Sequence, residues 1–131
     1  MKKLFFVLTV SVALFQLSSC AKKEGCTDPT ALNYDSSAED DNGTCTYKGS
    51  AIFWNDVASG LGNVAVQMAD GTTGVITADY TSAPDCGESS CFTYTAEPGT
   101  YSFSAAEVGG TATWNGSVTI TSNGCVSYRL Y

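Results

Sequence analysis

Oxygen-bearing side chains crowd the short stretch between Cys26 and Cys45, where they could bind a divalent cation. The candidate ligands are Asp28, Asn33, Asp35, Asp40 and Asp41. Calcium takes about six to eight hard oxygen ligands from flexible loops, and it would relieve the repulsion between neighbouring carboxylates. Asp and Asn also cap turns by accepting hydrogen bonds from backbone N–H groups. The stretch therefore predicts either a calcium site or a solvated, turn-rich loop without metal.

Catalytic chemistry lacks its usual residues in this sequence. The 131 residues contain no histidine, which removes the common general base of Ser and Cys hydrolases and the commonest ligand of catalytic zinc. Serine and threonine are abundant, but they fall on alternate positions of expected strands, where β-propensity accounts for them. We therefore expect no catalytic residues and a protein that is not an enzyme.

Two tryptophans are candidates for stacking on sugar rings. Trp54 and Trp114 lie in expected strands, and an exposed row of aromatic rings on a β-sheet can bind a glycan. Both also follow the inward phase of their strands. The alternative is that they belong to the hydrophobic core.

The charge balance restricts the partners. The chain has 6 Lys and Arg against 13 Asp and Glu, a net charge of −7. Such a chain is repelled by nucleic acid, so we expect no nucleic-acid partner. An anionic bilayer surface would repel it as well, so cations are the more natural counterpart of this charge.

The N-terminal segment has the features of an export signal. Lys2 and Lys3 precede an apolar run from residue 4 to residue 15, which is too short to span a bilayer as a permanent helix. The run closes with Leu17-Ser18-Ser19-Cys20. This ending resembles the bacterial lipobox, which implies that residues 1–19 are removed and that Cys20 carries the lipid. The resemblance implies a membrane contact through the lipid anchor in the outer membrane.

A short polar segment follows the proposed lipid site. Residues 20–25 are expected to form a tether to the folded part. Lys22-Lys23-Glu24 is similar to the surface-export signal of Bacteroidetes-type lipoproteins, although paired acids are missing. The cell surface is therefore favoured over the periplasmic face.

Residues 26–47 form a distinct acidic module. Gly25-Cys26-Thr27-Asp28, then Ala31-Leu32-Asn33-Tyr34-Asp35 and Asp41-Asn42-Gly43-Thr44-Cys45, resemble a cysteine-bounded repeat of Bacteroidetes surface proteins, with Asn42 inserted before the glycine. The segment has too few apolar residues to bury a core, so it needs a crosslink. We expect a Cys26–Cys45 disulfide that closes a loop of about 20 residues. By lowering the conformational entropy of the unfolded chain, this disulfide would stabilise the folded module by roughly 3 kcal/mol.

Three further cysteines lie in the remaining domain. Cys86 is expected to pair with Cys125, because a long crosslink stabilises a small domain more than a short one. Pairing of Cys86 with Cys91 is the alternative. Because five cysteines remain after lipidation of Cys20, one thiol is left unpaired or pairs with another chain.

From residue 48 onward the apolar residues alternate with polar ones, which is typical of strands with one buried face. Seven strands are expected, at residues 51–54, 64–69, 74–79, 92–96, 101–106, 114–120 and 126–130. They predict an all-β fold, a small antiparallel β-sandwich at residues 48–131 preceded by the disulfide-closed loop module. Gly74-Val75-Ile76-Thr77, the run Pro98 to Phe103 and Val118-Thr119-Ile120 resemble carboxypeptidase-regulatory, prealbumin-like domains, which are usually structural modules of surface proteins.

Together these patterns predict a lipid-anchored envelope protein without enzymatic activity. Its role would be structural or recognition, with a polysaccharide or an envelope protein as partner. The alternative is a calcium-stabilised adhesion or glycan-binding surface module. Apart from a calcium ion, no cofactor is expected.

Overall fold

The computed structural model describes residues 21–131, and its regular structure is almost entirely β. A single 3₁₀ turn at Val57–Ser59 is the exception among these residues. The strands are β1 (Glu24–Gly25), β2 (Asp40–Asp41), β3 (Gly49–Asp56), β4 (Val64–Met68), β5 (Thr73–Ile76), β6 (Asp79–Tyr80), β7 (Phe92–Ala96), β8 (Gly99–Glu107), β9 (Thr113–Ile120) and β10 (Cys125–Leu130). The predicted all-β class is confirmed. In residues 21–131, no helix is both long enough and apolar enough to cross a membrane.

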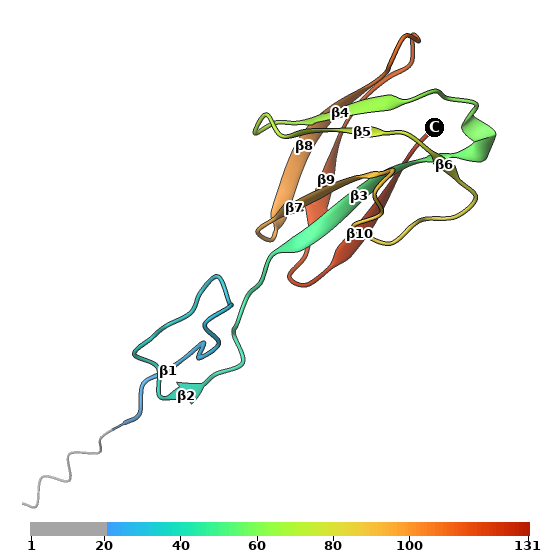
Figure 1. The fold of residues 1–131 in the computed structure, drawn as a ribbon. Coiled ribbons are helices and arrows are strands. Elements are labelled where there is room, and N and C mark those ends of the chain that lie inside the picture. Colours follow the sequence, from blue (N-terminus) through green and yellow to red (C-terminus); the bar gives the residue numbers. More distant parts are fainter. Residues whose placement is uncertain (1–20) are drawn as a thin grey trace, which may run out of the picture.

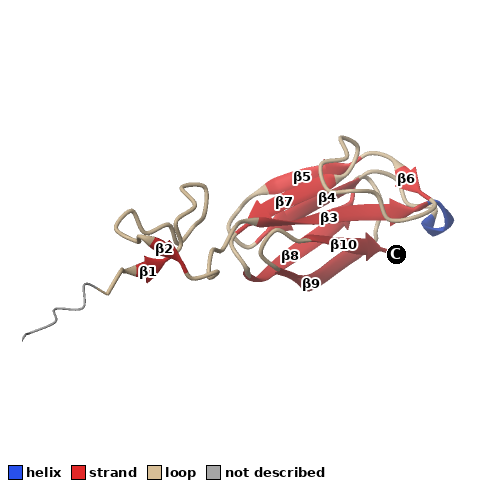
Figure 2. Cartoon of the chain, turned by 90° about the horizontal axis from the view of Figure 1, so that it is seen from below, coloured by secondary structure: helices blue, strands red, loops and turns tan. Residues whose placement is uncertain are grey.

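Two sheets pack face to face to form the predicted β-sandwich (Figures 1 and 2). One sheet places β3 between β10 on one side and β7 and β6 on the other. The second sheet has the order β5-β4-β8-β9, and all its pairs are antiparallel.

The pairing of β10 with β3 is parallel, which differs from the purely antiparallel sandwich expected from the sequence. The register runs from Cys125 opposite Ser50 to Leu130 opposite Asn55. A parallel pair cannot be closed by a tight hairpin and needs a long connection. Here the rest of the domain supplies that connection, because β3 and β10 are its first and last strands.

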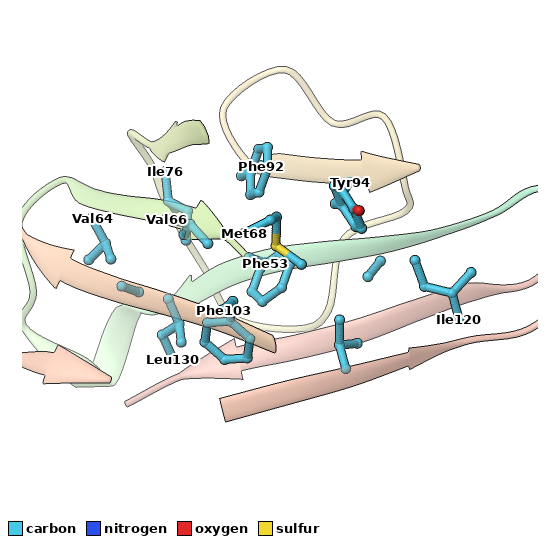
Figure 3. Packing of buried hydrophobic residues seen from close by; sticks show 13 residues of the cluster. Phe53, Val64, Val66, Met68, Ile76, Phe92, Tyr94, Phe103, Ile120 and Leu130 are labelled. Atoms are coloured by element: carbon cyan, nitrogen blue, oxygen red, sulfur yellow. The ribbon is translucent and has the colours of Figure 1, made fainter. Parts of the chain in front are cut away.

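The core lies between the sheets and is built from the alternate residues of each strand. Phe53 of β3 is fully buried at its centre, with the Phe103 ring 4.8 Å away and the Phe92 ring 5.7 Å away between centroids (Figure 3). The inward residues Val64, Val66 and Met68 of β4 complete the packing. The period-two pattern of the sequence identified the inward face of β4 correctly, but it placed Trp54 of β3 inward, whereas Phe53 is the inward residue and Trp54 points to the outer face.

Strand β3 is buried on both faces. Ile52 and Trp54 point away from the main core and pack with Cys91, Tyr80 and Cys86 in a second cluster. The segment between β6 and β7 therefore covers the outer face of the first sheet. This double burial explains why Ala51-Ile52-Phe53-Trp54 is a continuous apolar run in the sequence.

The acidic module begins earlier than the sequence suggested. Glu24 and Gly25, expected in the tether, form β1 and pair with β2 in parallel. Lys22 Nζ lies 3.2 Å from Asp40 Oδ1, and Lys23 Nζ lies 2.7 Å from Asp35 Oδ2. These ion pairs hold residues 22–25 against the module because its excess of carboxylates attracts the two lysines. Only Ala21 then separates the folded module from Cys20.

Candidate functional site

Most of the predicted calcium ligands accept hydrogen bonds from backbone N–H groups in turns. The Asp28 carboxylate accepts hydrogen bonds of 2.8 Å from the Thr30 N–H and hydroxyl and of 2.7 Å from the Tyr47 hydroxyl. These bonds, that of Tyr47 foremost, lower the pKa of Asp28, and the same carboxylate raises the pKa of Tyr47. Asp41 accepts from the Gly43 N–H at 2.8 Å.

The remaining predicted ligands also have protein partners. Asn33 bridges the two ends of the module, because its Oδ1 accepts from the Thr46 N–H and its Nδ2 donates to the Thr44 carbonyl, both at 2.8 Å. Asp35 accepts from Ser37, and the Lys23 ammonium lowers the pKa of its carboxyl group.

The structure does not bring these carboxylates together. Within residues 21–131, no group of three or more His, Cys, Asp or Glu side chains is arranged to hold a metal ion. The observed contacts are those of the turn-rich loop that the sequence offered as the alternative. Calcium would compete at Asp28 with the Thr30 and Tyr47 donors and at Asp35 with the Lys23 ammonium.

Both expected disulfides are confirmed. Cys26 bonds to Cys45 and Cys86 bonds to Cys125. Among residues 21–131, Cys91 is the one free thiol; it is buried, and this burial raises its pKa, which is the environment of an unreactive cysteine. The predicted lipid site Cys20 lies outside the described residues.

The two candidate tryptophans have different environments. Trp54 is only 5% exposed, and its indole N–H donates to the Ser127 hydroxyl at 2.7 Å. Its proposed role in stacking on a ligand is therefore wrong, because the segment between β6 and β7 covers its ring. Trp114 is half-buried at the start of β9, and its indole N–H donates to the Tyr131 carbonyl at 2.9 Å.

Trp114 borders a small hollow between the edge strands β9 and β10. The hollow measures about 440 Å³ and is also lined by Ser127, Tyr128, Arg129 and Tyr131. The Arg129 guanidinium lies 4.9 Å from the centre of the exposed Tyr131 ring and 3.0 Å from Asp56 Oδ2. The only cation of residues 49–131 is thus neutralised by a carboxylate and stacked on an aromatic ring.

A larger hollow, which we call the trough, lies on the outward face of the β5-β4-β8-β9 sheet. It measures about 660 Å³, and Trp114 lines it as well as the smaller hollow. The outward side chains form two rows across the four strands, one of Val75, Ala65, Ala106 and Thr113 and one of Thr73, Gln67, Ser104 and Asn115. The trough exists because the outward residues in the centre of the first row are alanines.

The trough offers hydrogen bonds and apolar contact. Its lining combines hydroxyl and amide groups with exposed methyl groups, and no charged side chain is among the described residues that line it. Without an acid, a base or an activated nucleophile, this arrangement suits binding. The sequence showed the small outward residues of these strands, but not that they lie next to each other.

The position of the trough follows from the strand register. Ala106 pairs with Thr113 at one end of the β8-β9 ladder, while Gly99 pairs with Ile120 at the other. The Tyr47 N–H donates to the Ser122 hydroxyl at 2.9 Å just beyond Ile120, which joins the module to that second end. The trough therefore lies toward the end of the sandwich away from the module.

Comparisons with known proteins do not assign the chain to a family. No protein-family model matches the chain, and no curated protein matches it. Among solved structures, the Bacillus anthracis TIE protein aligns with a TM-score of 0.41 and 14% identity. That alignment covers 63% of this chain and 16% of the other chain.

Proposed function

We propose that this chain is a lipid-anchored protein of the cell envelope that recognises a ligand and does not catalyse a reaction. The observation that carries the proposal is the trough, a hollow of about 660 Å³ that is lined by hydrogen-bonding but not by titratable side chains. A site of this composition can hold a ligand and cannot supply general acid or base catalysis.

The anchoring part of the proposal depends on Cys20 and its neighbours. The lipobox-like Leu17-Ser18-Ser19-Cys20 would direct the attachment of a lipid to Cys20, and the ion pairs of Lys22 and Lys23 fix the module a short distance after it in the sequence. A lipid on Cys20 would hold the module at the membrane surface. The sandwich would then present the trough away from the bilayer.

Two measurements test this proposal. Mass spectrometry of the mature N-terminal peptide is expected to give a peptide that begins at Cys20 and carries acyl groups, and a Cys20→Ala variant is expected to lose them. An unacylated mature N-terminus at another residue would refute the anchor. Protease treatment of intact cells, with lysed cells as the control, distinguishes the surface from the periplasmic face, and we expect cleavage without lysis.

A further inference from the structure

The geometry points to a ligand class for the trough: we propose that it binds a neutral polysaccharide chain laid across the β5-β4-β8-β9 sheet. This inference rests on the recognition role proposed above. It adds the chemistry of the ligand, which follows from the charges, the hydrogen-bonding groups and the dimensions of the trough.

The absence of charge in the trough selects against an ionic ligand. Residues 49–131 include seven Asp and Glu but one basic residue, Arg129, whose guanidinium is paired with Asp56. The nearby acids are turned to local donors: Asp70 accepts from the Thr72 N–H, and Glu107 accepts from the Gly62 N–H. An anionic polymer would meet a net negative domain, and a cationic one would find no carboxylate in the lining.

The groups that remain are those that bind sugars. Gln67, Ser104 and Asn115 form one row of amide and hydroxyl groups, which can donate to and accept from sugar hydroxyls. The Ala65 and Ala106 methyl groups and the exposed Val75 side chain form an apolar floor against which the C–H face of a sugar ring can pack. The Trp114 ring does not belong to this surface, because Trp114 pairs with the inward residue Ala105 and its ring packs against the core.

The shape of the site favours a polymer over a single sugar. The two rows run across four strands, a distance of about 14 Å at roughly 4.8 Å between neighbouring strands. A chain of several sugar units can follow these rows across the sheet, whereas a single sugar unit would contact only part of them.

Calorimetric titration of the full-length protein tests the assignment. The probes are hexasaccharides of neutral sugars (β-1,4-glucan, β-1,3-glucan, α-1,4-glucan, β-1,4-mannan and β-1,4-xylan) and the anionic hexagalacturonate, in a detergent without a sugar headgroup. The test variant is Ala106→Lys, which fills the floor of the trough. Its matched control is Ser117→Lys, an exposed outward residue on the same sheet that does not line the trough.

We expect at least one neutral hexasaccharide to bind, and Ala106→Lys to weaken it at least about tenfold while Ser117→Lys changes it less than about twofold. Thermal melting should be similar for both variants. Failure of all five neutral probes, equal loss in both variants, or tighter binding of hexagalacturonate would overturn the inference. So would a dimer that Ala106→Lys abolishes, because a second copy would then occupy the trough. Acylation of Cys20 is measured separately, so a negative titration does not count against the anchor.

Discussion

The hydroxyl of Tyr94 donates a 2.9 Å hydrogen bond to the carboxylate of Asp70, which joins the two sheets of the sandwich. Tyr94 lies on β7, and Asp70 lies in the turn between β4 and β5. The Thr72 N–H and the Tyr94 hydroxyl lower the pKa of Asp70. Burial, followed by the bond to Asp70, raises the pKa of Tyr94 to about 12.

The Tyr94→Phe substitution should lower the melting temperature by several degrees at neutral pH, and the difference should depend on pH. The folded pKa of Tyr94 is above its unfolded value, so its contribution is present below about pH 10 and is lost as the pH rises toward 12. The folded pKa of Asp70 is depressed, so its contribution is lost on acidification below about pH 4. Melting followed by circular dichroism from pH 2 to pH 11 should show that the difference in melting temperature between the wild type and Tyr94→Phe becomes smaller at both extremes.

Tyr101→Phe is the control, because it removes a hydrogen bond to the Glu97 carbonyl instead. A melting-temperature difference for Tyr94→Phe that does not change with pH would contradict the role of the Tyr94–Asp70 bond.

Removal of the Lys23 charge should raise the pKa of the Asp35 carboxyl group. Because Lys23 is the main cause of the lowered pKa of Asp35, Lys23→Gln is expected to raise that pKa toward the ordinary value of about 3.9. Carboxyl ¹³C NMR titration measures the change directly. Lys22→Gln, whose partner is Asp40, should leave the Asp35 titration in place. An Asp35 pKa that stays low in Lys23→Gln would show that Ser37 alone sets it.

Sequence patterns predicted most of the strands and the inward face of β4, because the side-chain period of a strand is independent of its neighbours. The single strand expected at residues 74–79 is instead β5 and β6, which belong to different sheets. The partner of each strand is not encoded in that period, so the parallel β3-β10 pair was not predicted. The burial of both faces of β3 was also not predicted. Trp54 is buried because the segment between β6 and β7 packs over it, and the path of that segment cannot be inferred from the strand pattern. The trough could not be predicted from the sequence either, since Ala65 and Ala106 become neighbours only through the strand register.

Gly74 on β5 is a position where no side chain fits. A Cβ atom built there would lie 2.0 Å from Cδ2 of the buried Phe92 ring across the sandwich. Gly74→Ala should therefore destabilise the domain by roughly 1–3 kcal/mol, because either Phe92 or the β5 backbone must move. Gly62→Ala is the control, since its Cβ would meet only Glu107 Oε1 at 3.7 Å. Denaturant unfolding compares the two, and equal stability would show that the Phe92 ring relaxes without cost.

The Cys86–Cys125 disulfide should protect the thiol of Cys91. It ties the segment between β6 and β7 to the first residue of β10, and Cys86 packs against the cluster that buries Cys91. A Cys86→Ala/Cys125→Ala variant is expected to lose on the order of 4 kcal/mol and to expose Cys91 to a thiol reagent. Cys26→Ala/Cys45→Ala should leave the labelling rate of Cys91 unchanged. Equal labelling in the two double variants would separate the burial of Cys91 from the disulfide.

Calcium is expected to have no effect on thermal stability. Each predicted ligand in the module already has a protein hydrogen-bond or ion-pair partner, for example Tyr47 at Asp28 and Lys23 at Asp35. Differential scanning calorimetry with added Ca²⁺ and with chelator should give the same melting temperature, with Mg²⁺ as the control cation. A rise that is specific to Ca²⁺, and that is lost in Asp28→Asn, would instead support the calcium-stabilised module.

The parallel pair of β3 and β10 has a consequence for the biogenesis of the protein. The central strand of the first sheet gains one of its neighbours only when the last strand of the domain becomes accessible. Pairings between segments so distant along the polypeptide make folding slow. A nascent chain of this topology therefore completes its first sheet only after β10 has been synthesised.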